Sequence, residues 1–116
     1  MALNIVNVAT ITGKIAGGAV TTGSGITLIA AVATDNVAKV NALYVSNVDG
    51  TNPAAINVVV NDGSTDYHIA KTITVPADST LDVLSKSIYL EPTWSLKVIA
   101  SADSDLEAVA SWENMA

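Results

Sequence analysis

The feature that most constrains the fold is a regular series of short β-type runs between residues 38 and 113. Each run is rich in β-branched and other apolar residues, and turn-forming Gly, Pro, Asp, Asn and Ser residues separate neighbouring runs. The runs are residues 40–47, 55–61, 67–75, 81–90, 94–101 and 106–113. Several short strands at this spacing are typical of an all-β sandwich or barrel.

Alternation within the runs predicts antiparallel sheets that each bury one face. In residues 106–113 every second side chain is apolar. In residues 67–75 the same rule places Lys71 among apolar side chains. The opposite faces also carry apolar residues, including Val59 and Val109, which predicts a second, partly apolar surface that a small sandwich does not need to bury.

The amino-terminal part differs from the rest because five of the seven glycines lie between residues 13 and 25. Residues 4–12 alternate loosely and predict a strand. Glycine weakens strands, so residues 13–25 are not expected to hold a regular strand throughout. We therefore predict that residues 1–25 are a strand with a flexible connection, or an arm that docks on a neighbour. Residues 26–116 then form an antiparallel β-sandwich, jelly-roll-like or related, of about eight strands.

The composition favours association with another protein. Half of the residues are apolar, yet they are mostly Ala and Val, and there is no Phe. Such side chains bury little area each, which predicts a thin core. The mean hydropathy of +0.45 is high for a small monomer, so part of the apolar surface is expected to meet a partner.

Charge and length argue against several other kinds of partner. The chain has five Lys, no Arg and a net charge of −6, whereas nucleic-acid binding needs a basic stripe. The longest apolar run, residues 26–33 with Thr27 inside it, is far too short to span a membrane. The absence of cysteine excludes disulfides, thiolate metal sites and cysteine nucleophiles. We predict no nucleic-acid and no membrane partner.

No catalytic constellation is recognisable. His68 is the only histidine and has no nucleophile motif or second histidine at metal-ligand spacing. Asp62, Ser64 and Asp66 have the spacing that opens a calcium loop, but Ile73 occupies the position of the bidentate Glu. A turn closed by Asx hydrogen bonds explains the same residues. We predict no enzyme, metal site, cofactor or small-molecule substrate, and leave a cation at Asp62 and Asp66 as an alternative.

The candidate interface residues are large aromatics, apolar residues of the second face and glycines of the amino-terminal part. Trp94 follows Pro92 and Thr93 at a strand start, where an aromatic residue at the rim often anchors a partner. The complete set is Trp94, Tyr44, Tyr89, Val59, Val109, Gly17 and Gly18.

Five stretches resemble the small β-sandwich virion proteins of tailed bacteriophages, notably those of cyanophages and marine phages. They are residues 40–51 (VNALYVSNVDGT), 67–81, 87–91, 96–102 and 106–113 (LEAVASWE). The resemblance covers residues 38–113 and is less distinct in the first 25 residues.

The resemblance implies a structural virion protein without enzymatic activity or cofactor. Its most specific implication is a capsid decoration or cement protein, which binds the major capsid protein and stabilises its lattice. Such a protein assembles in the host cytoplasm, is a homotrimer and lies on the capsid exterior. Alternatives are a neck, tail or fibre component, or a carbohydrate-binding module that recognises the host surface.

Overall fold

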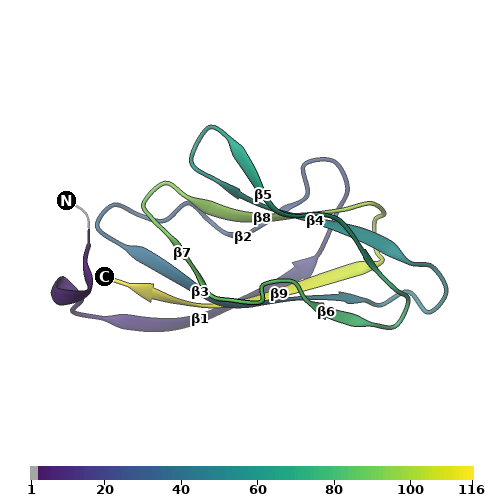
Figure 1. The fold of residues 1–116 in the computed structure, drawn as a ribbon, viewed down its shortest axis with the longest axis horizontal. Helices are drawn as coiled ribbons and strands as arrows, with labels where there is room; N and C mark the ends of the chain where they lie inside the picture. Colours follow the sequence, from purple (N-terminus) through teal and green to yellow (C-terminus); the bar gives the residue numbers. More distant parts are fainter. Residues whose placement is uncertain (1–2) are drawn as a thin grey trace.

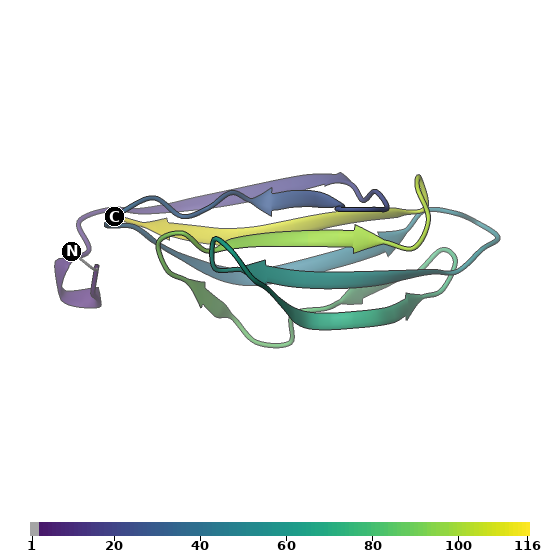
Figure 2. The ribbon, with the colours of Figure 1, turned by 90° about the horizontal axis from the view of Figure 1, so that it is seen from above.

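The computed structural model describes residues 3–116, which form two antiparallel β-sheets packed face to face (Figures 1 and 2). We call them sheet A and sheet B. Sheet A consists of β1 (Ile11–Ala19), β9 (Leu106–Met115), β3 (Val37–Asn47) and β6 (Thr80–Asp82), and β7 (Ile88–Leu90) also pairs with β3. Sheet B consists of β2 (Ile26–Ile29), β8 (Ser95–Ala100), β4 (Ala54–Asn61) and β5 (Asp66–Val75). A short 3-10 turn, η1 (Ile5–Asn7), precedes β1.

The strand order is that of a jelly roll. β1 pairs with β9, β2 with β8, β3 with β6 and β7, and β4 with β5. If β6 and β7 count as two halves of one strand, numbering the strands in order gives sheets of order 1-8-3-6 and 2-7-4-5. This is a long, folded antiparallel ribbon wrapped into two sheets. The predicted all-β sandwich is confirmed, with nine strands rather than about eight.

The core lies between the sheets and consists of aliphatic side chains. The largest fully buried ones are Leu43, Ile56, Leu90, Leu96 and Leu106, and five buried alanines keep the layers close together. Trp94 and Trp112 are only partly buried and pack against this core from its margins. No helix in the described part of the chain is long and apolar enough to cross a membrane.

Residues 13–25 do not form a strand throughout, as predicted, but the strand of this part lies later than the expected residues 4–12. β1 includes Gly13, Gly17 and Gly18, and its nine residues pair with β9 without a register shift. The flexible connection is shorter than expected, and its Gly23 and Gly25 have positive φ angles. A Cβ on Gly25 would overlap the carbonyl oxygen of Val98, so this position needs glycine. Of residues 1–25, the first two lie outside the described residues.

β1 forms despite its glycines because β9 supplies a complete hydrogen-bonding partner. The entropic cost of each glycine in a strand is only about 0.5–1 kcal/mol. The loosely alternating segment before it, residues 4–12, is a strand only from Ile11 onward. Residues 1–25 therefore match the first alternative, a strand with a connection, and this strand is an edge of sheet A.

β5 shows why Lys71 interrupts its apolar face. The register against β4 shifts twice, between Ile56 and Val58 and between Val58 and Val59. Ala70 therefore pairs with Val58 and packs against the core, whereas Lys71 falls between paired positions and is exposed. The predicted apolar face of β5 holds at its two ends, where Tyr67, Ile73 and Val75 pair with core-facing residues of β4, and fails between the two bulges, where Ala70 takes the inward position instead of Lys71.

Asn47 is the only buried polar residue among residues 3–116 and ties three segments together. Its amide nitrogen donates to the backbone oxygens of Asn52 and Val75, both at 2.9 Å. Its side-chain oxygen accepts from the backbone N–H of Asp49 at 2.9 Å. The end of β3, the following loop and the end of β5 are therefore held by one side chain.

We expect Asn47→Ala to lower the free energy of unfolding by roughly 1–3 kcal/mol. The backbone oxygens of Asn52 and Val75 both lose their donor, and the hydrogen bond to Val75 is buried, so water does not replace it. The matched control is Asn41→Ala, also on β3, whose amide makes one exposed hydrogen bond to Glu113. This change should alter stability by less than about 0.5 kcal/mol. Urea unfolding measures both, and equal losses would contradict the role of Asn47.

Candidate interaction surfaces

The outer face of sheet A brings several predicted interface residues together. Gly17 on β1 pairs with Val109 on β9, and Val109 pairs with Tyr44 on β3, so the three lie in one row across three strands. Tyr89 lies toward one end of the same face, opposite Lys39. The sequence had singled out these four residues separately, and the strand register makes them neighbours.

This face carries several exposed apolar side chains beside polar ones such as Glu107 and Ser111 on β9. The exposed fractions are 73% for Ile15, 60% for Tyr89, 58% for Ile11, 47% for Tyr44 and 38% for Val109. Antiparallel sheets that face water usually alternate apolar residues inside with polar residues outside. The outer face of sheet A thus has the character of a contact surface.

Val59 and Gly18 do not belong to this surface. Val59 is 1% exposed and lies on β4 between its pairing partners, His68 on β5 and Lys97 on β8. Its assignment to an exposed apolar face was wrong, because the longer side chains of His68 and Lys97 lie on the same face on either side of it and cover it. Gly18 is partly buried, and a Cβ there would come within 3.2 Å of the Ile26 side chain. Its role is therefore close packing of β1 against β2.

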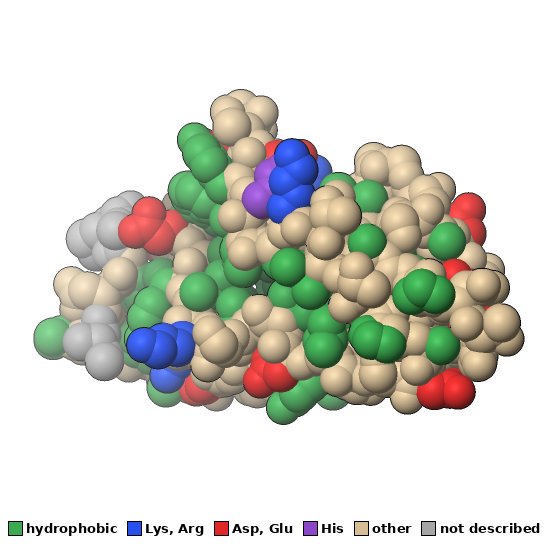
Figure 3. Space-filling model, turned by 45° about the vertical axis from the view of Figure 1, so that its right-hand side comes forward, with side chains coloured by type: hydrophobic (Ala, Val, Ile, Leu, Met, Phe, Trp, Pro, Cys, Tyr) green, Lys and Arg blue, Asp and Glu red, His purple; other side chains and the backbone are tan. Residues whose placement is uncertain are grey.

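Trp94 lines a separate hollow between the two sheets. Its ring stacks on Tyr67, with centroids 5.9 Å apart and an interplanar angle of 27°. A cavity of about 380 Å³ adjoins it, and Figure 3 shows hydrophobic side chains gathered between the two layers on the face that it views. The cavity is lined by Val60, Ile69, Ile88, Tyr89, Leu90, Glu91 and Trp94. Tyr89 lies on the edge strand β7, so it borders both the outer face of sheet A and this cavity, whereas Tyr44 lies on the outer face alone.

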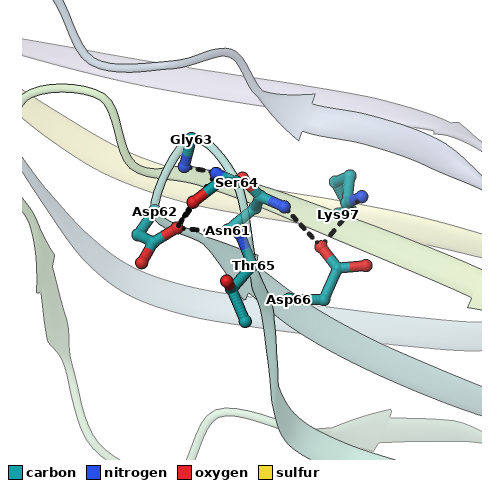
Figure 4. Close-up of polar contacts among 7 residues, drawn as sticks. All are labelled: Asn61, Asp62, Gly63, Ser64, Thr65, Asp66 and Lys97. Atoms are coloured by element: carbon teal, nitrogen blue, oxygen red, sulfur yellow. Dashed lines mark hydrogen bonds and ion pairs between the residues drawn. The ribbon is translucent and has the colours of Figure 1, made fainter.

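The acidic turn between β4 and β5 is closed by its own hydrogen bonds (Figure 4). One Asp62 carboxylate oxygen accepts from the backbone N–H of Ser64 at 3.0 Å and from that of Thr65 at 2.9 Å. Asp66 accepts from the Asn61 amide at 2.7 Å and forms an ion pair with Lys97 at 3.0 Å. The two carboxylates therefore have different partners and do not converge on one point.

These contacts change the acidity of both groups. Backbone N–H donors from Ser64 and Thr65 lower the pKa of Asp62 below its ordinary value of 3.8. The Asn61 amide and then Lys97 lower the pKa of Asp66. Across residues 3–116 there is no group of three or more His, Cys, Asp or Glu side chains that could hold a metal ion. The geometry favours the Asx-turn interpretation over a calcium loop.

Because the pKa of Asp62 is lower in the folded chain than in the unfolded chain, its contribution to stability is present above pH 3.8 and is lost as the pH falls through the folded pKa. We expect Asp62→Asn to keep the turn acceptor and to reduce this acid-side loss, measured as unfolding free energy against pH. Asp82→Asn, at an exposed carboxylate at the end of β6, is the control. If both variants lose stability toward acid pH as the wild type does, the hydrogen bonds of Asp62 are not the cause of that loss.

Comparison with known proteins identifies the fold but no family. No protein-family model matches the chain. No curated protein matches it. Among solved structures, it is similar to a subunit of Bacillus endospore appendages, a family of disulfide-linked pili, with a TM-score of 0.54 and 15% identity over 91% of this chain and 86% of that one. At this identity the likeness shows the sandwich fold alone, and the chain, which lacks cysteine, cannot form the disulfides by which those pili are linked.

Proposed function

We propose that this protein is a structural subunit of a tailed-phage virion, and most specifically a capsid decoration protein that binds and stabilises the major capsid protein lattice. The observation that carries the proposal is the outer face of sheet A, with Gly17, Val109 and Tyr44 in one row and Ile15 beside it. The sequence resemblance over residues 38–113 supplies the virion context.

The physical form of the chain suits this role. Its principal-axis extents are 49 × 26 × 19 Å, so it presents a broad flat side to a surface. Covering the apolar side chains of that face would remove them from water, which favours binding by about 25 cal/mol per Å² before ordering costs are subtracted. Binding to the folded state also stabilises both partners by mass action. A neck, tail or fibre protein would bury the same apolar face against its neighbours, and this position in the virion is the structural alternative.

The test is binding to phage heads assembled without this protein, followed by sedimentation and quantification of bound copies. Wild type should bind in hundreds of copies per head, as repeated lattice sites require. Val109→Asp should weaken binding by at least about tenfold, because it places a charge in the centre of the contact. A dozen copies or fewer would indicate a neck or tail position instead.

The matched control is Thr74→Asp, which places the same charge on the exposed outer side of β5 in sheet B. It should bind as wild type does. Thermal unfolding of both variants checks that they are folded. Equal loss of binding in the two variants, or none in either, would overturn the assignment of the contact to the outer face of sheet A.

A second candidate function, recognition of host-surface carbohydrate, is favoured by the pocket that Trp94 and Tyr89 share. A flat aromatic ring supplies apolar area to the face of a sugar, and Glu91 supplies a hydrogen-bond acceptor at the rim. The stack of Trp94 on Tyr67 holds the ring in place.

On a glycan array, this candidate predicts binding by wild type that is lost in Trp94→Ala and in Tyr89→Ala. Tyr89 is 60% exposed, so its variant tests the pocket without disturbing the core. Tyr44→Ala, on the outer face of sheet A, should bind as wild type. An array without any bound glycan excludes this candidate.

A further inference from the structure

The outer edge of β1 carries a complete row of backbone hydrogen-bonding groups. Thr10 and Ala116 exchange two hydrogen bonds, and Val20 donates to Leu106, so the even-numbered residues of β1 direct their N–H and C=O groups toward β9. The odd-numbered residues direct theirs away from the sheet. These are Ile11, Gly13, Ile15, Gly17 and Ala19, and none of their backbone groups has a hydrogen-bond partner outside the β1–β9 ladder in residues 3–116.

The other sheet edges are interrupted in ways that discourage further pairing. β6 and β7 are three residues each, and β2 has four residues with a register shift against β8. β5 has two register shifts, and Thr72 has a positive φ of 54°. Short, bulged edges are how proteins avoid adding a strand. β1 has nine residues in unbroken register, and Figure 2 shows it along one margin of the molecule.

The residue pattern along this edge is symmetric about Ile15. Gly13 and Gly17 lie two residues to either side of it, and a Cβ would meet nothing at Gly13 and only ordinary contacts at Gly17. Neither glycine has a positive φ. The folded chain alone therefore does not require glycine at these two positions, whereas a neighbouring strand that brings a bulky side chain beside them would.

We propose that β1 pairs antiparallel with β1 of a second copy of this chain, about a two-fold axis at Ile15. Ile15 then faces Ile15 of the other copy, and Gly13 faces Gly17 in both directions. Each exposed Ile15 side chain lies diagonally beside a glycine of the other copy, which leaves room for it. Five residue pairs satisfy the outward backbone groups, and sheet A becomes continuous across both copies with one enlarged apolar face.

This contact is isologous and closes on itself, so it yields a dimer rather than the trimer that the sequence resemblance implies. The proposed contact between two β1 strands is independent of whether the protein belongs to a phage virion. The contact is a strand edge rather than a broad interface, so the dimer is expected to dissociate on dilution.

The experiment uses single cysteines, since the chain has none of its own. In a hydrogen-bonded antiparallel pair the Cα atoms are about 5.5 Å apart, within disulfide range. Mild oxidation of Ile15→Cys should therefore give a covalent dimer. Ile11→Cys is the control, because Ile11 is also exposed and lies on the same strand. In the proposed dimer it is about 27 Å from Ile11 of the other copy, at roughly 3.4 Å per residue over eight residues.

A second measurement uses charge. Ile15→Lys and Ile15→Glu should each raise the dissociation constant of the dimer at least about tenfold in sedimentation equilibrium, because like charges would meet at the axis. An equimolar mixture should restore association, because Lys then meets Glu. Ile15 is 73% exposed, so these variants should fold normally, which circular dichroism checks.

A wild-type protein that is monomeric at high concentration overturns the proposal. Equal crosslinking of the Ile11 and Ile15 variants, or a trimer indifferent to charge at Ile15, also overturns it. Because none of these measurements involves phage heads or glycans, their outcome is independent of whether the proposed function holds.

Discussion

The pairing of β3 with β9 is the interaction on which the rest of the structure depends. It joins residues 37–47 to residues 106–115 and gives β9 its second partner beside β1. Its inward side supplies Leu43, Val45 and Leu106 to the core, all fully buried. Its outward side supplies Tyr44 and Val109 to the contact face. Because a slip of one residue would exchange the two sides, the same register determines both the core and the surface.

Much of this architecture could be predicted from local patterns. The alternation in residues 106–113 correctly assigned the buried side of β9, since this strand is regular along its length. Local patterns failed where tertiary contacts overrode them. The glycines of β1 were taken as breaks, but β9 holds them in a strand. Lys71 on an apparently apolar face was the visible sign of a bulge that the alternation rule could not accommodate.

The contact surface was less accessible from sequence than the fold. Tyr44, Val109 and Gly17 were each recognised as candidates, but their sequence separations gave no indication that they share a row. Ile15, the most exposed apolar residue of β1, was missed because the glycines around it suggested irregular backbone. Val59 was misassigned because alternation distinguishes the two faces of a strand, but not whether side chains of the neighbouring strands cover the second one.

The jelly-roll order also has a consequence for synthesis. β1 leaves the ribosome early, whereas its partner β9 is made about ninety residues later, a delay of roughly 5–20 s at usual elongation rates. Throughout that interval both edges of residues 11–19 are unpaired. Aggregation-prone segments combine high β-propensity with few glycines. Three glycines within nine residues therefore limit aggregation of the unpaired nascent strand, and the proposed contact between two copies of β1 is expected only after β9 has ordered β1.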